Sequence, residues 1–470
     1  MMYQGSKGKG NMGLKSASEH IPPEGISRRE FLNRSFKAGV SVTALGTFLS
    51  SCGITGQQKG DGGGTSTISI AISDSPWLPS FEEVTNVYNQ ETGNTVNLAV
   101  YPFDGLFSKE LDAVNNKTGE FDLLIMGAPS LETFYKGGFI TPLTEIDPDF
   151  EFPPEVIEYT NLGRWDRETS FFSETGDPYA LPINGNTQIL YYRTDLYDEM
   201  GLEPPTTWDE AITAARQVNE VDSDVYGYVI RGRAGSEIVY NFLPVLHSFG
   251  GSVFANEPED WSVTINSEEA LQALELYREL ASYGPSEPGS IGQAEMIVLF
   301  QSGRSLQNHM VTAAYSDIQN EGSSEVADKV GYAVVPRAAN GQHASMIGTW
   351  TMGIPADISD SQKQAAYDFL QWIMTEDAQM KYGQAGGIVT RQDVYEALAD
   401  QEGFRWMRAV ADSSPYLRRG VHYYDFAVEL QDVMGQRLDE IVSGSLEPRQ
   451  GLDTLASEIE PIVEEATANR

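Results

Sequence analysis

The stretch TISIAISDSPWLPSFEEVTNVYNQETGNTVNLAVYPFDGLFSKELDAVNNKTGEFDLLIMG, residues 67–127, decides the fold class. It opens on a β-branched apolar run, Thr67–Ser73, which predicts a buried strand. Apolar residues then recur at helical spacing from Phe81 to Tyr88, and Gly93 ends the pattern. A second strand is predicted at 94–101, a second helix at 104–119 and a third strand at 121–127. Alternating strands and helices are typical of an α/β domain with a parallel layer.

Ligands of open α/β sheets bind beyond the carboxyl ends of the strands. That rule points to the loops at 73–78 and 127–132. Candidate binding residues after the first strand are Asp74, a hydroxyl acceptor, and Trp77, which could equally be a core residue. Asp104 follows the second predicted strand and Ser130 follows the third.

The next informative stretch is YALPINGNTQILYYRTDLYDEMGLEPPTTWDEAITAARQV, residues 179–218. Thr207 is predicted as a helix N-cap, with Glu210 three residues on completing a capping box. This stretch resembles the segment between the lobes in family 1 extracellular solute-binding proteins, the sugar-type receptors of ABC importers. The similarity continues in order through residues 240–254, 265–280 and 348–396.

The resemblance implies an α/β, type II periplasmic-binding-protein-like fold, whose two lobes are joined by crossover strands at a hinge. We expect residues 67–183 and 347–383 in the first lobe, and 184–346 and 384–470 in the second. The crossings are expected near 182–186, 337–347 and 383–389. Glycines at 383, 386 and 387 suit a hinge, and they suit a helix cap and turn equally well.

The resemblance also implies a function: binding a mono- or oligosaccharide between the lobes and delivering it to the permease subunits of an importer. A sugar site needs aromatic plates and short polar partners. The segment IGTWTMGIP resembles a family segment whose tryptophan stacks on sugar, and that tryptophan is Trp350 here. Tyr240 matches an aromatic residue of the family that contacts sugar. Asn184 and Asn186 lie in the first crossing, where the alternative is a plain Asn-Gly-Asn turn. Gly387 completes the expected site, whereas Ser130 stands where many relatives carry Asp followed by Trp.

No catalytic residue, metal site or cofactor is predicted. The five histidines lack metal-ligand spacing, and neither a Gly-x-Ser-x-Gly elbow nor a phosphate-binding loop occurs. Acidic pairs are expected by chance in a chain with 68 Asp and Glu. Two alternatives stay open: a secreted, lipid-anchored carbohydrate-active hydrolase, and a receptor of the same fold for a solute other than a sugar.

The segment SRREFLNRSFKAGVSVTALGTFLSSCG, residues 27–53, contains the single cysteine, Cys52. Its order of arginines, apolar run and small residues is that of an export signal, and the apolar run is too short to span a bilayer. SRREFL resembles a twin-arginine export motif, and LSSC resembles the lipobox of bacterial lipoproteins. We therefore expect residues 1–51 to be removed, Cys52 to carry lipid, and 52–66 to form a flexible tether. The protein would be extracytoplasmic and attached to the membrane through its lipid alone.

Acidic residues dominate the charge. Residues 1–51 hold seven of the 31 Lys and Arg and three of the 68 Asp and Glu, so the chain from Cys52 onward carries a net charge of −41. Such a charge disfavours nucleic acid and anionic lipid surfaces as partners. Separately, we expect the protein to be a monomer. The site loops contain no acidic cluster of the kind that a cationic ligand would need, so we interpret the acidity as adaptation to a salty habitat.

The charge gives a first testable prediction. Ions screen like-charge repulsion on a folded surface. The thermal midpoint should therefore rise from low to molar salt in a series of melts. A flat or falling midpoint would contradict the halophilic interpretation.

Overall fold

The computed structural model describes residues 65–128 and 130–468. These residues belong to one compact unit, Gly64–Arg470. The predicted export signal, Cys52 and most of the tether lie outside the described residues. No helix within the described ranges is both long enough and apolar enough to cross a membrane.

The first lobe is built on a five-stranded sheet. Its strand order is β2 (Thr95–Tyr101), β1 (Thr67–Ser73), β3 (Leu123–Met126), β13 (Trp350–Gly353) and β6 (Ala180–Asn184). β1 is parallel to both β2 and β3, which confirms the predicted parallel layer. β13 enters from much later in the chain and runs antiparallel to β3 and β6.

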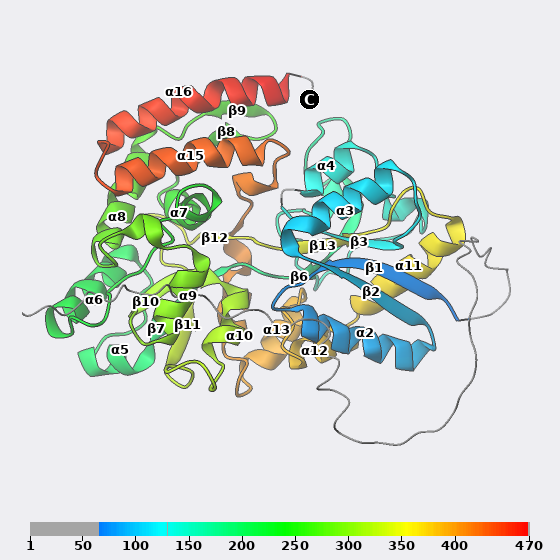
Figure 1. Cartoon of the computed structure of the whole chain (residues 1–470), viewed down its shortest axis with the longest axis horizontal. Coiled ribbons are helices and arrows are strands. Elements are labelled where there is room, and N and C mark those ends of the chain that lie inside the picture. Colours follow the sequence, from blue (N-terminus) through cyan, green and yellow to red (C-terminus); the bar gives the residue numbers. More distant parts are fainter. Residues whose placement is uncertain (1–64, 129, 469–470) are drawn as a thin grey trace, which may run out of the picture. The chain divides into compact units, whose positions relative to one another are not determined.

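Helices cover both faces of this sheet. In Figure 1, α3 (Phe103–Asn115) lies above the sheet and α2 (Leu78–Thr92) lies below it. α2 ends where predicted, because Gly93 adopts the left-handed conformation with φ of 75° that glycine accepts readily. The other helices of this lobe are α4 (Ser130–Lys136), α11 (Asp360–Ile373) and α12 (Glu376–Gln384), of which α12 packs on α2.

The second lobe contains a three-stranded antiparallel sheet in the order β10 (Gln307–Val311), β7 (Gln188–Arg193) and β11 (Val330–Ala333). Four helices pack together in its core: α7 (Ser236–Ser248), α8 (Glu268–Ser282), α15 (Ala427–Val442) and α16 (Pro448–Thr467). The predicted capping box is confirmed at the start of α6 (Trp208–Val221). Trp208 is buried and its indole N–H donates to Ser248 Oγ at 2.8 Å, so this tryptophan is structural.

Short elements complete the fold. The helices are α5 (Thr194–Met200), α9 (Gln293–Gln301), α10 (Tyr315–Ile318), α13 (Gln392–Ala399) and α14 (Trp406–Ser413), with 3-10 turns that include η5 (Val421–Tyr423). The two-stranded pairs are β4 (Arg164–Trp165) with β5 (Asp177–Pro178), β8 (Phe254–Asn256) with β9 (Asp260–Val263), and β12 (Ser345–Met346) with β14 (Leu417–Arg418).

Two connections between the lobes run side by side. Residues 185–187 join β6 of the first sheet to β7 of the second, and 347–349 join β12 to β13. An antiparallel bridge pairs Thr187 with Ile347, so the two connections support each other. Near the third expected crossing, Ser80 Oγ donates to the Ala385 carbonyl oxygen at 2.8 Å and the Tyr315 hydroxyl donates to that of Gly386 at 2.5 Å. The lobe boundaries given above stay predictions.

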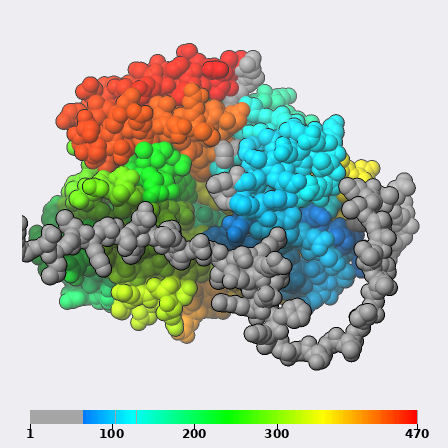
Figure 2. All heavy atoms as spheres, in the orientation of Figure 1, coloured from blue at the N-terminus to red at the C-terminus, as the bar shows by residue number. Residues whose placement is uncertain are grey.

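The lobes also touch beside these connections. Lys136 of α4 forms an ion pair of 2.6 Å with Asp425, just before α15. Figure 2 shows the cyan surface of the first lobe adjoining the orange surface of α15. Phe171 and Phe172 follow β4. Phe171 packs in the core of the second lobe, and Phe172 packs in the core of the first lobe. The Arg419 guanidinium lies 4.4 Å and 4.9 Å from the two ring centroids.

Candidate ligand cleft

A pocket of about 390 Å³ is lined by residues of both lobes. Ala128, in the loop after β3, contributes from the first lobe. From the second lobe come residues before and on α7, on η5 and on α15: Arg231, Ser236, Tyr240, His422, Ala427, Val428, Gln431 and Asp432. The volume lies within the range of small-molecule sites. The pocket therefore lies beyond the carboxyl end of β3, one of the two ends nominated from the sequence.

Trp350 is the first residue of β13 and does not itself line this pocket. It is half-buried, and its ring rests on Gly127 at the end of β3. A Cβ atom at position 127 would be 2.9 Å from Trp350 Cε3, so a glycine is needed there for the ring to lie flat. Trp77 is 5 % exposed and packs between Phe81 and Trp350, with 6.4 Å between the two tryptophan ring centroids. The sequence left open whether Trp77 binds ligand or packs in the core. In the structure it packs in the core beside Trp350.

Asn186 and Tyr240 converge on Gly348 in the second connection. A Cβ atom at position 348 would lie 3.0 Å from Tyr240 Oη and 3.1 Å from Asn186 Nδ2. The Asn186 side-chain oxygen accepts the Ala313 N–H at 3.1 Å, which fixes the amide and leaves its NH₂ group with no protein acceptor among the described residues. The Tyr240 hydroxyl donates to the Met346 carbonyl oxygen at 3.3 Å. An amide donor and a hydroxyl thus meet where no side chain fills the space.

The remaining predicted residues lie around this centre. Asn184 is fully buried and accepts the Asn186 backbone N–H at 3.1 Å, so it shapes the turn that aims Asn186. Ser130 is buried, and its hydroxyl donates to the Gly127 carbonyl oxygen at 2.7 Å. Gly387 lies against the Tyr382 ring, since a Cβ atom at position 387 would come within 2.2 Å of Tyr382 Cε2. Asp74 is exposed after β1. Asp104 lies in the first turn of α3, and its side chain is outside the description.

Arg231 is the main residue of the cleft that the sequence analysis missed. It is 7 % exposed, and its guanidinium lies over the Tyr240 ring at 5.3 Å from the centroid. It forms a close ion pair with Glu237 and donates to Gln293 Oε1 at 3.2 Å. Its backbone N–H donates to Asn241 Oδ1 at 3.0 Å, so both the main chain and the side chain are held.

A local signal could have revealed Arg231. The segment YVIRGRAGSEIVYNF places it directly after an apolar run and before a glycine-containing loop that leads into α7. The same pattern nominated Asp74 and Trp77 in the first lobe, although residues 228–230 form no strand in the structure. Gln431 and Asp432 gave no such signal, because they lie inside the amphipathic pattern of α15.

His422 contributes no charge to the cleft at neutral pH. Burial lowers the pKa of His422 to about 4, and its Nε2 lies 3.0 Å from the Ile347 carbonyl oxygen, to which a neutral imidazole donates. The His422 ring packs edge-on to Tyr240 with 5.1 Å between centroids. Burial also raises the pKa of Tyr240, so its phenol stays protonated. The two rings form a neutral polar wall.

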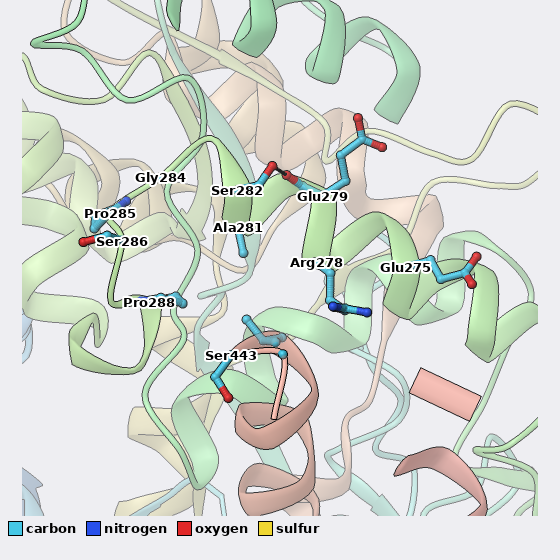
Figure 3. A pocket seen from close by; sticks show the side chains of 12 residues that line it. Glu275, Arg278, Glu279, Ala281, Ser282, Gly284, Pro285, Ser286, Pro288 and Ser443 are labelled. Carbon is cyan, nitrogen blue, oxygen red and sulfur yellow. Dashed lines mark hydrogen bonds between the residues drawn. The ribbon is translucent and has the colours of Figure 1, made fainter. Parts of the chain in front are cut away.

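Another pocket, of about 460 Å³, lies in the second lobe between α8 and the end of α15. Figure 3 shows Arg278 of α8 pointing toward the turn that carries Ser443. None of the predicted binding residues lines it. The described ranges also contain no group of three or more His, Cys, Asp or Glu placed to hold a metal ion.

Comparison with known proteins shows the family. Residues 71–380, more than half of the chain, match the model of the bacterial extracellular solute-binding proteins. The chain belongs to that family.

Named relatives in the family support the alignment along the chain. A mannitol-binding protein of Pseudomonas aeruginosa is 26 % identical over 76 % of this chain and 78 % of its own length. An erythritol/L-threitol-binding protein of Mycolicibacterium smegmatis is 24 % identical over 87 % of this chain and 93 % of its own. The fold is shared with the solute-binding protein of Agrobacterium radiobacter K84 solved with ribitol: TM-score 0.67, 22 % identity, 84 % of this chain and 98 % of that chain. The two-lobed α/β fold predicted from the sequence is thereby confirmed.

Proposed function

We propose that this solute-binding protein is an extracytoplasmic receptor for a neutral sugar or sugar alcohol, which it delivers to the permease subunits of an ABC importer. One observation supports the proposal: Tyr240 lines a pocket to which both lobes contribute, Asn186 lies near Tyr240 at Gly348, and the Trp350 ring rests on Gly127, the residue before Ala128 of the pocket lining. The relatives that bind mannitol and erythritol agree with a polyhydroxylated ligand.

The chemistry of the cleft fits hydroxyl groups. A sugar presents C–H faces to an aromatic plate and O–H groups to amide, hydroxyl and carboxylate partners. Trp350 offers the plate, the Asn186 NH₂ group a donor, and Gln431 and Asp432 acceptors on α15. Val428, 65 % exposed on the same helix, adds an apolar contact for C–H groups.

Binding would draw the lobes together. Ala128 faces the cleft from the first lobe and Tyr240 from the second, so a ligand between them gains contacts that neither lobe offers alone. The equilibrium then shifts toward a closed form, with bending at the connections 185–187 and 347–349. The lobe boundaries stated from the sequence are part of this proposal.

The ligand can be identified without guessing it. The purified protein is denatured, and the small molecules it releases are identified by mass spectrometry. We expect a neutral sugar or polyol, recovered chemically unchanged. Release of an amino acid, peptide or polyamine would favour a non-sugar receptor of the same fold, and recovery of cleaved glycosides would favour the hydrolase alternative.

Membrane attachment is a separate part of the proposal, and it rests on the order of arginines, apolar run and LSSC in residues 27–53. Lipid on Cys52 would keep the receptor beside its importer, whose permease subunits would be its partner. The receptor itself would be a monomer. Replacing Cys52 by Ser should move the protein from the membrane pellet to the supernatant of its native host. Intact, unprocessed protein in the membranes of the wild-type host would contradict the anchor.

A further inference from the structure

Arg231 places a buried cation at the wall of the ligand cleft. Burying a guanidinium is costly unless a carboxylate compensates its charge. Glu237, in the first turn of α7, is that carboxylate: it pairs with Arg231 and accepts the Gln293 N–H at 3.1 Å. The Glu237 side chain is 25 % exposed, and both its partner Arg231 and its chain neighbour Ser236 line the pocket.

The charges that face the cleft do not balance. Asp432 lines the same pocket from α15 and adds a second carboxylate. His422 is neutral at pH 7, because burial lowers its pKa. Neither Arg233 nor Lys136 lines the pocket, and each has a carboxylate partner: Arg233 pairs with Glu295 at 2.8 Å and Lys136 with Asp425. Because Glu237 balances the charge of Arg231, Asp432 leaves this part of the cleft with a net negative charge.

We propose that Glu237, by neutralising Arg231, makes the cleft select neutral sugars and polyols over the corresponding sugar acids. The inference rests on the proposed function and adds a residue that determines specificity. Without Glu237, Arg231 would offer a buried guanidinium to any carboxylate in the cleft, an arrangement suited to strong binding of an anion. With Glu237 in place, a ligand carboxylate meets a net negative wall, and such like-charge contacts are strongly unfavourable in a partly desolvated site.

The guanidinium still contributes to a neutral ligand. Of its five N–H groups, the pairs with Glu237 and Gln293 engage three. The remaining donors can serve ligand hydroxyls, and stacking over Tyr240 keeps the guanidinium plane in place. Arg231 thus presents directed donors while its charge is cancelled.

The test uses two pairs of probes, D-mannitol with D-mannonate and erythritol with erythronate. Each pair replaces a terminal CH₂OH by a carboxylate. Binding is measured by calorimetry at pH 7 on the full-length protein, for the wild type and for Glu237→Gln. We expect the wild type to bind a neutral probe, and to bind the corresponding acid at least about tenfold more weakly than that neutral probe. Glu237→Gln should reverse or abolish that preference by a gain in acid affinity of about tenfold or more.

Matched variants separate this effect from a general change of charge. Glu268→Gln removes a carboxylate that pairs with Arg449 on the exposed surface of the same lobe, and it should leave the acid-to-polyol ratio unchanged. Should Glu237→Gln fail to fold, Asp432→Asn removes the exposed second carboxylate, and it should raise acid affinity by a smaller factor.

The outcomes distinguish the two proposals. Wild-type protein that binds a polyol and its acid equally well overturns the charge selection and leaves the receptor for polyols standing. The selection is equally contradicted if a folded Glu237→Gln variant keeps the wild-type ratio. The proposed ligand class is overturned if the wild-type protein binds only the acids. It is also overturned if the protein binds neither member of either pair but does bind an unrelated solute. In both cases the charge selection is overturned as well.

Discussion

Replacing Trp350 by Ala should weaken ligand binding about thirtyfold while the protein stays folded. Truncating a buried aromatic anchor typically costs roughly 2 kcal/mol or more of binding free energy, which corresponds to this factor. Trp350 begins a strand that β3 and β6 hold on both sides, so its backbone keeps its place without the ring. Calorimetry with the ligand identified from the purified protein, or with D-mannitol, measures the loss.

Two variants control for this change. Trp350→Phe keeps an aromatic plate and should retain most of the affinity. Trp372→Ala removes a half-buried tryptophan from α11 that packs on Tyr88 and Phe369, so it should leave affinity unchanged. Wild-type affinity in Trp350→Ala would mean that this ring does not stack on the ligand.

Replacing Phe171 by Ala should lower the free energy of unfolding by about 3–5 kcal/mol, the usual cost of removing a buried Phe ring. Phe171 is 1 % exposed and packs edge-on to Trp261 at 5.5 Å between centroids. The Arg419 guanidinium covers the same ring, so the change also removes a cation–π contact. Because Phe171 carries a first-lobe segment into the core of the second lobe, its loss should also weaken the contact between the lobes.

Denaturant unfolding followed by tryptophan fluorescence measures this effect. Phe404→Ala, which removes a half-buried ring packed against the core cluster that contains Trp406, should cost clearly less. Ligand affinity should change little, since Phe171 does not line the cleft pocket. A Phe171→Ala variant as stable as the wild type would show that this ring does not hold the two cores together.

Local sequence signals predicted the elements that depend on nearby residues. The β-branched run at Thr67–Ser73 and the helix that ends at Gly93 are encoded by periodicity and by a left-handed cap, both short-range features. The capping box of Thr207 and Glu210 is equally local. These signals act within a few residues, so they survive without knowledge of the rest of the chain.

Features that depend on distant segments could not be predicted this way. The strand that contains Trp350 enters the first sheet between β3 and β6, and nothing within residues 350–353 specifies those neighbours. The burial of Trp77 follows from that insertion, since the Trp350 ring lies beside it. The pairing of Arg231 with Glu237 and Gln293 is likewise a tertiary arrangement that the pattern around Arg231 does not specify.

The proposed receptor function is tested most directly by a calorimetric titration of the purified, unliganded protein with D-mannitol, erythritol, ribitol, glucose and maltose. We expect saturable binding of at least one of these neutral compounds, at one molecule per protein, with the compound recovered unchanged. Failure of all of them to bind, together with binding of an amino acid, peptide or polyamine or with conversion of a sugar to products, would contradict it.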